Sequence, residues 1–248
     1  FGGAATKAEG AAVTFDDAKE ACTARYTHQT VALAFAITEE AIEDNLYDRL
    51  GNRYARALAR SMANTKQVKG AEILNNAFSS SQLGGDGVVL CSTAHPTVSG
   101  TDLVNTFTTQ ADLSETSLED ALIKIAAFID ERGLRIAIQG RKLIIPKELQ
   151  FTAERILKSP LRVGTADNDI NALRNMGMLP EGYVVNHYLT DTDAYFIKTD
   201  CPTGFKHFVR APLATGMEGD FDTGNMRYKA RVSYSFGYSD TCCVYAFP

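Results

Sequence analysis

The 248-residue chain carries 25 Lys and Arg residues against 30 Asp and Glu residues, a net charge of −5, and 45% of its residues are hydrophobic. This composition is typical of a globular protein with a sizeable core, and no apolar run approaches the roughly 20 residues of a membrane helix. The acidic balance argues against a protein whose main task is to grip phosphate backbones. Five cysteines without a CxxC pair favour a reduced, cytosolic-type protein.

The first 28 residues are rich in small and charged side chains. Two short β-prone pieces, "AVTF" and "CTARYTH", flank the polar "DDAKE", and this order predicts an extended, exposed hairpin. Large apolar residues are scarce in this segment, so we expect the hairpin to lie on another surface. The chain begins with Phe and shows no signal-peptide pattern, which indicates that another segment preceded it.

A strand is predicted to run directly into a very long helix. From Thr30 to Ile37, apolar residues alternate with small ones, which is the period of a strand. After Thr38, a suitable N-cap, apolar residues recur at every fourth position, as on one face of a helix. They are Ile42, Leu46, Leu50, Tyr54, Leu58 and Met62. The pattern continues to about Phe78, which gives a helix of roughly 60 Å. A compact domain of about 100 residues has a radius of gyration near 13 Å. The predicted helix is longer than the diameter of such a domain, so it is not expected to be buried within one core.

Residues 101–215 alternate helix and strand signals and predict a mixed α/β region. Ser117 and Asp120 have the spacing of a capping box before "LEDALIKIAAFIDER", and Gly133 stands where a helix C′ residue belongs. Pro146 is expected to open the next helix. The segments "RIAI", "KLIIP", "YVVNHYL", "AYFIKT" and "KHFVR" predict strands.

The end of the chain predicts one long strand. Apolar and polar residues alternate without a fault from Asn225 to Tyr238, so one face of this strand is expected to be buried. No hydrophilic linker divides the chain, which indicates that a second domain is inserted rather than appended.

Enzyme signatures are absent, because the sequence contains no GxSxG, HExxH, Walker A or GxGxxG motif. We therefore expect no enzyme activity, no cofactor and no metal site. Residues 167–171 can be interpreted as a cation loop or as a helix N-cap cluster, and they lack the Gly and Glu of a calcium loop. Residues 190–193 can be interpreted as a cation site or as a polar turn between two strands. Residues 84–87, "GGDG", can be interpreted as an anion cradle or as a tight turn.

The cysteines offer two chemical hypotheses. Cys91 lies near His95 in sequence, which is one feature of a nucleophilic dyad. A dyad needs a third group that orients the base, and the sequence identifies none. The adjacent Cys242 and Cys243 could form a redox pair, but sequence neighbours rarely meet disulfide geometry, so small apolar residues of a core are the favoured interpretation.

One charged pattern points to a contact surface. Arg49, Arg53, Arg56 and Arg60 follow the spacing i, i+4, i+7 and i+11 and share one face of the predicted long helix. One interpretation is an electrostatic contact with acidic residues of a neighbouring chain, or a loose contact with nucleic acid. The other is a solvated face that pairs with Asp48 and its neighbours.

Five stretches together resemble the major capsid protein of tailed bacteriophages, the family whose fold is named after phage Hong Kong 97. They are "AEGAAVTFDDAKEACTARYTH", "FAITEEAIEDNLYDRL", "ILNNAFSS", "GGDGVVLCSTAHP" and "RYKARVSYSFGYSD". The resemblance runs over nearly the whole chain and in the same order.

The resemblance implies an α+β, Hong Kong 97-like capsid fold. Residues 1–29 would form the extended loop, or E-loop, which reaches over a neighbouring subunit. Residues 30–100, with a spine helix at about 38–78, and residues 216–248, with the long C-terminal strand, would form the peripheral or P-domain. Residues 101–215 would form the inserted axial or A-domain. The family's N-terminal arm would precede Phe1.

The function that the resemblance implies is structural. Identical subunits would assemble into hexamers and pentamers and then into an icosahedral phage head that encloses double-stranded DNA. Portal, scaffold and decoration proteins are further implied partners, with assembly in the host cytoplasm and a final location in the virion; no membrane is implied. An encapsulin-like nanocompartment shell is the alternative, and an α/β enzyme with site residues far apart in sequence is a more distant one.

The expected inter-subunit contacts lie in the loop and on the arginine face of the long helix. The residues are Asp16, Asp17, Lys19, Glu20, Arg49, Arg53, Arg56 and Arg60. Charge pairs at such interfaces mostly set specificity and register.

Overall fold

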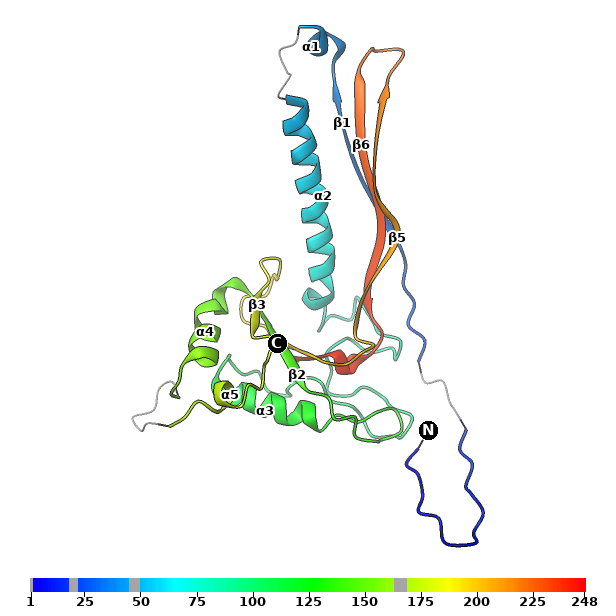
Figure 1. Cartoon of the computed structure of the whole chain (residues 1–248), viewed down its shortest axis with the longest axis vertical. Coiled ribbons are helices and arrows are strands. Elements are labelled where there is room, and N and C mark those ends of the chain that lie inside the picture. Colours follow the sequence, from blue (N-terminus) through cyan, green and yellow to red (C-terminus); the bar gives the residue numbers. More distant parts are fainter. Residues whose placement is uncertain (1, 18–21, 45–49, 163–168) are drawn as a thin grey trace. The chain divides into compact units, whose positions relative to one another are not determined.

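The computed structural model describes residues 2–17, 22–44, 50–162 and 169–248 (Figure 1). The chain forms two compact units, each built from segments that are far apart in sequence. One, which we call the sheet–helix unit, comprises residues 26–73 and 206–237. The other, the mixed unit, comprises residues 1–25, 74–205 and 238–248.

The sheet–helix unit contains a three-stranded sheet in the order β1-β6-β5. Its strands are β1 (Gln29–Ile37), β5 (Phe205–Gly219) and β6 (Met226–Tyr238). β1 and β6 are antiparallel, with Val31 opposite Val232 and Phe35 opposite Tyr228. Because side chains alternate across a strand, the larger apolar residues of both strands share one face. The alternation in the sequence predicted β1 and β6 correctly.

The apolar face of this sheet packs against helix α2 (Leu50–Asn75), which runs alongside the strands in Figure 1. The rings of Phe35 and Tyr54 lie 5.6 Å apart, and Phe35 also stacks on Tyr228 at 4.9 Å. Near the other end of the helix, Gly70 faces the ring of Phe236. These ring contacts hold the helix along the sheet.

The structure describes the predicted long helix in two parts. α1 runs from Glu39 to Glu43 with Asp44 as its C-cap, and α2 runs from Leu50 to Asn75 and so ends before Phe78. Asp has low helix propensity because its side chain competes for backbone hydrogen bonds, which favours an end at this point. With 26 residues, α2 is about 39 Å long. Residues 45–49 lie outside the described residues.

The described part of the predicted N-terminal hairpin, residues 2–17 and 22–28, contains no strand, although the Gly2 N–H donates to the Asp16 carboxylate across the segment. The assignment of this segment as an E-loop stays a prediction. A two-stranded hairpin without an apolar surface beneath it is marginally stable at best. The scarcity of large apolar residues in this segment therefore outweighs its β-prone pieces.

The mixed unit contains a four-stranded sheet in the order β3-β2-β4-β7. Its strands are β2 (Gly140–Ile145), β3 (Tyr183–Val185), β4 (Tyr195–Thr199) and β7 (Val244–Phe247). β2 runs parallel to β3 and antiparallel to β4, and β4 runs antiparallel to β7. The helical elements of the unit are α3 (Glu115–Ala126), η1 (Lys147–Leu149), α4 (Gln150–Lys158), α5 (Ala172–Asn175) and η2 (Thr241–Cys243).

The core of the mixed unit joins α3 to this sheet. Its fully or nearly fully buried members include Leu118, Leu122, Ile125, Leu143, Ile145, Tyr195, Ile197, Tyr245 and Phe247. The close approach requires glycine at the start of β2, since a Cβ on Gly140 would lie 2.6 Å from Leu122 Cδ2 and 3.1 Å from Ile197 Cγ2. Gly140 thus lets the helix and strands meet.

The boundaries of α3 differ from the prediction at both ends. Ser114, not Ser117, is the N-cap, because its hydroxyl accepts a hydrogen bond from the Ser117 N–H at 3.1 Å while the Ser117 hydroxyl accepts one from the Ser114 N–H at 3.0 Å. The helix ends at Ala126, and Gly133 instead lies in a separate turn with φ of +82°, where its N–H donates to the Asp130 carbonyl.

The chain changes unit at other places than the sequence suggested. The predicted boundary at residue 215 falls inside β5, whose residues 206–219 belong to the sheet–helix unit. β7, predicted to accompany the long C-terminal strand, pairs with β4 in the mixed unit. The identification of the two units with the P- and A-domains stays a prediction.

Candidate assembly surfaces

The predicted arginine face lies in the N-terminal half of α2. Arg53, Arg56 and Arg60 are exposed, and none of them takes part in an ion pair within the described ranges. Arg49 and its suggested partner Asp48 lie outside those ranges. The face therefore presents three positive charges that the described part of the chain leaves without a partner, which suits an acidic surface.

The apolar side of α2 is also incompletely covered. Met62 and Ala71 are buried, whereas Tyr54, at the N-terminal end, is 44% exposed despite its contact with Phe35. Ile42 of α1 is 47% exposed. The apolar pattern that predicted one continuous buried face is thus buried only toward the C-terminal end of the helix.

Asp16, the first predicted contact residue of the loop, has partners within its own chain. The Arg132 guanidinium donates to both carboxylate oxygens, at 2.9 and 3.0 Å, and the Gly2 N–H donates at 2.6 Å. The Gly2 N–H and the Arg132 charge lower the pKa of Asp16 below its ordinary value. Asp17 is exposed, and Lys19 and Glu20 lie outside the described residues.

The same segment exposes two apolar side chains that the sequence analysis did not single out. Phe15 is 97% exposed and Val13 is 65% exposed. Burial of a Phe or Val side chain stabilises a protein by about 1.5–3 kcal/mol. The segment therefore carries apolar contact area as well as charge.

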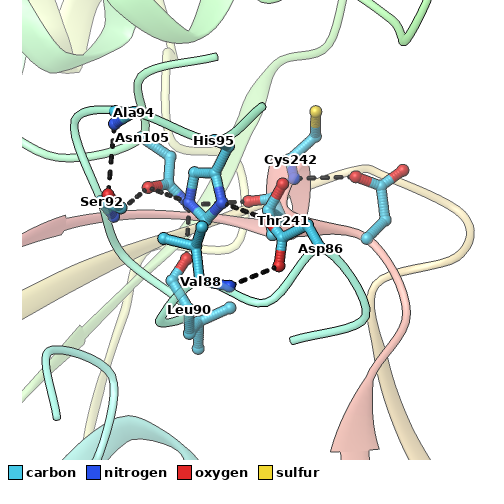
Figure 2. Close-up of polar contacts among 10 residues, drawn as sticks. Asp86, Val88, Leu90, Ser92, Ala94, His95, Asn105, Thr241 and Cys242 are labelled. Atoms are coloured by element: carbon cyan, nitrogen blue, oxygen red, sulfur yellow. Dashed lines mark hydrogen bonds and ion pairs between the residues drawn. The ribbon is translucent and has the colours of Figure 1, made fainter. Parts of the chain in front are cut away.

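A buried polar network holds the loop that carries residues 84–105 (Figure 2). The Asn105 side chain, fully buried, accepts a hydrogen bond from the Ser92 N–H at 2.8 Å and donates to the carbonyls of Leu90 at 2.7 Å and Thr241 at 3.0 Å. These three contacts fix the orientation of the amide. They also tie the loop to η2, which leads into β7.

His95, 2% exposed, completes the network. Its Nδ1 lies 2.6 Å from Asp86 Oδ2 and its Nε2 lies 3.2 Å from Asn105 Oδ1. Each ring nitrogen therefore lies within hydrogen-bond distance of an oxygen of a neighbouring side chain, which fixes the orientation of the imidazole. Asp86 belongs to the "GGDG" segment, which is a tight turn in which the Gly87 N–H donates to the Gly84 carbonyl.

The Cys91–His95 dyad hypothesis fails for a reason that the sequence did not show. An orienting carboxylate is present, Asp86, but both ring nitrogens of His95 already have partners and neither is left for a thiol. Cys91 is 3% exposed, and burial raises the pKa of its thiol. A thiol that stays protonated is a poor nucleophile, so the cluster is structural.

The cysteines should differ sharply in reactivity. Cys22 is exposed, whereas Cys91, Cys242 and Cys243 are buried, and burial raises the pKa of each buried thiol. In the native protein we expect a thiol reagent to label Cys22 first, with the buried thiols labelled only after unfolding. Peptide mapping by mass spectrometry after brief alkylation measures this order, and early labelling of Cys91 would contradict the described packing.

Where the structure describes them, the first suggested cation loop ends in a helix N-cap and the second is a polar turn. Asn171, buried, caps α5 by accepting a hydrogen bond from the Arg174 N–H, and its amide donates to the carbonyls of Ile156 and Ser159. Asp193 N–H donates to the Asp191 carboxylate at 3.3 Å. Among the described residues, no group of three or more His, Cys, Asp or Glu side chains is placed to hold a metal ion. Likewise, no helix there has both the length and the apolar character required to cross a bilayer.

Comparison with known structures identifies the fold. The capsid of a gene transfer agent (GTA) particle superposes with a TM-score of 0.60 at 10% identity, over 98% of this chain and 80% of that chain. The capsid of the cyanophage P-SCSP1u gives 0.58 at 13% identity, over 99% and 80%. An encapsulin complex from Synechococcus elongatus gives 0.51 at 10% identity, over 88% and 72%. No curated protein matches the sequence.

The structural matches confirm the predicted α+β capsid fold of the Hong Kong 97 type. The sequence itself matches the family model described as phage capsid protein over residues 20–246. This match covers almost the whole chain, and family and fold agree that the protein is structural in kind. The chain belongs to the phage capsid protein family.

Proposed function

We propose that this chain is the major subunit of an icosahedral phage head, in which identical copies form hexamers and pentamers that enclose double-stranded DNA. The observation that carries the proposal is the surface of the single chain: three exposed arginines on α2 and an exposed Phe15 have no partners in the described part of the molecule. Heterologous contacts between identical copies close into rings, and many weak contacts per subunit add up to a stable shell.

Imaging of the purified protein tests this proposal. We expect the full chain to form closed particles that sediment far faster than the 27.0 kDa subunit. Negative-stain electron microscopy should show a shell with five-fold and six-fold clusters. A monomer under all assembly conditions would count against the proposal.

The arginine face should be needed for assembly. The triple variant Arg53→Glu, Arg56→Glu and Arg60→Glu brings like charges together if this face meets acidic residues, which costs several kcal/mol at an interface. We expect particle yield to fall at least about tenfold, measured by sedimentation of equal amounts of folded protein. Lys124→Glu, an exposed cation of α3, is the matched control and should assemble normally. Unchanged yield of the triple variant would mean that the face is merely solvated.

A nanocompartment shell is the second candidate, favoured by the similarity to the encapsulin structure. The two functions differ in contents. Nuclease-protected DNA inside particles from infected or induced cells supports a phage head, whereas a co-purifying cargo enzyme without DNA supports a compartment.

A further inference from the structure

The N-terminal segment of the mixed unit, residues 2–17, is a loop whose two ends meet. The Gly2 N–H donates to Asp16 Oδ2 at 2.6 Å, so one hydrogen bond joins two positions that lie 14 residues apart. The Ala11 N–H donates to the Ala8 carbonyl at 3.1 Å, which places the turn of the loop midway between its ends. Figure 1 shows this segment in dark blue, without strands. We call it the N-terminal loop.

Both ends of the N-terminal loop lie against one turn of the mixed unit. The Arg132 guanidinium donates to both carboxylate oxygens of Asp16, at 2.9 and 3.0 Å. A Cβ on Gly2 would lie 3.4 Å from Arg132 Nη2. At the next position, a Cβ on Gly3 would lie 3.5 Å from Leu134 Cδ2. The first residues of the loop and its last acidic contact therefore share one anchor.

This anchor turn, residues 130–134, is held by its own hydrogen bonds. Asp130 Oδ1 accepts from the N–H groups of Arg132 and Leu134, at 2.9 and 2.8 Å. The Asp130 N–H donates to the Leu134 carbonyl at 2.7 Å, and the Gly133 N–H donates to the Asp130 carbonyl at 3.0 Å. A turn with its backbone groups paired in this way is a fixed base, so the Arg132 side chain starts from a defined position.

Apolar burial contributes little to holding the N-terminal loop. All of residues 3–17 are exposed, and Phe15 is 97% exposed. A flexible loop gains conformational entropy when its ends separate, and the polar contacts at Asp16 oppose this gain. A single exposed ion pair is weak, but here the Gly2 N–H and the Arg132 guanidinium share one carboxylate. Hydrogen bonds to a charged acceptor are stronger than neutral ones.

We propose that Arg132 and Asp16 form a latch that holds both ends of the N-terminal loop on the anchor turn in the unassembled chain. Arg132 is a positioning residue, since it acts on the loop through Asp16. While the latch is closed, it limits the directions in which Phe15 is presented. The Asp16 side chain is 43% exposed and that of Arg132 is 25% exposed, so water and salt reach the latch and it opens readily.

Backbone order parameters from ¹⁵N relaxation, measured on deuterated, unassembled full-length protein, test the latch. In wild type we expect values above about 0.8 at the amides of Gly3 and Asp17, as in rigid backbone. Arg132→Gln and Asp16→Asn should each lower them below about 0.6, the range of flexible backbone. Because the two groups act as one latch, the double variant should be no more mobile than either single variant.

Two further variants separate a latch from a general effect of lost charge. Lys142→Gln removes another ion pair of the mixed unit, between Lys142 Nζ and Glu181 Oε2 at 2.7 Å, and should leave the loop unchanged. Arg132→Lys keeps the charge and should recover at least about half of the lost order. Circular dichroism checks that every variant folds. Unchanged order parameters in either single variant, an equal fall in Lys142→Gln, or additive effects in the double variant would overturn the proposal.

The effect of the latch on assembly rests on the proposed function. A loop that is already restricted loses less conformational entropy on contact with another copy. We expect Arg132→Gln to slow particle formation, followed by light scattering, by about two- to fivefold, as suits a partly exposed contact. If the order parameters fall and wild-type and variant shells form equally fast, the latch stands and its role in assembly is wrong. If wild type forms no shells, the proposed function fails and the order parameters still decide the latch.

Discussion

Replacement of Asn105 by Ala should destabilise the mixed unit by about 3 kcal/mol. The fully buried amide satisfies the Ser92 N–H and the carbonyls of Leu90 and Thr241, and it also accepts from His95. Each buried polar group that loses its partner costs about 1–3 kcal/mol. Three neighbours, the Ser92 N–H and the carbonyls of Leu90 and Thr241, lose a side-chain partner that lies at 3.0 Å or less.

In the Asn105→Ala variant, the loop and η2 should unfold locally more often, and the stability of the whole unit should also fall. Because Asn105 joins the loop to η2, hydrogen exchange of the amides of residues 88–95 and 241–247 should accelerate in the variant, and the urea midpoint should fall. Asn76→Ala is not a suitable comparison, since that residue has contacts of its own. The matched control is Asn52→Ala on the exposed surface of α2, which should change the free energy of unfolding by less than about 0.5 kcal/mol. Equal exchange rates in Asn105→Ala and wild type would contradict the network.

The sequence predicted the strands that have one face buried along their whole length. β1 and β6 alternate because one face of each packs against α2 and its neighbours, and this periodicity is local in the chain. The same alternation already displayed Arg227, Lys229 and Arg231 as the polar set. The pairing that places them beside β1 joins residues roughly 200 positions apart, which no local pattern reveals.

The buried network could not be predicted in the same way. Asp86, His95 and Asn105 lie at unremarkable spacings, and the carbonyl of Thr241 is 136 residues from Asn105. No periodicity links such positions, because a polar network in a loop is defined by tertiary packing rather than by an element. The search for a third group beside Cys91 and His95 failed for this reason, although Asp86 lay nine residues away.

The ends of the long helix show a different limit. Apolar residues recur from Ile42 to Met62 on both sides of the C-cap of α1, so the pattern could not reveal the end of α1 at Glu43. The exposure of Tyr54 and Ile42 suggests why the pattern persists. Under the proposed function, a contact with another copy would cover the apolar side chains that the single chain leaves exposed.

Truncation of the last aromatic residue of β7, Phe247→Ala, should have the largest effect on stability, about 4 kcal/mol. Phe247 is fully buried, stacks on Tyr195 at 4.2 Å and on Phe107 at 4.7 Å, and belongs to the core that joins α3 to the sheet. Phe→Ala changes in cores cost about 3–5 kcal/mol, because the transfer free energy of the ring is lost and a cavity remains.

The comparison that isolates this effect is Phe151→Ala in the same unit, because Phe151 on α4 is 75% exposed. We expect its free energy of unfolding to stay within about 0.5 kcal/mol of wild type, while Phe247→Ala unfolds at much lower urea and yields no particles at 37 °C. Phe247→Leu should recover part of the loss, since a smaller cavity remains. Equal midpoints for Phe247→Ala and Phe151→Ala would show that the four-stranded sheet does not need β7. In that case β7 would contribute little to the stability of the fold. The hydrogen bond from Asn105 to Thr241 of η2, which leads into β7, would then also contribute less to stability.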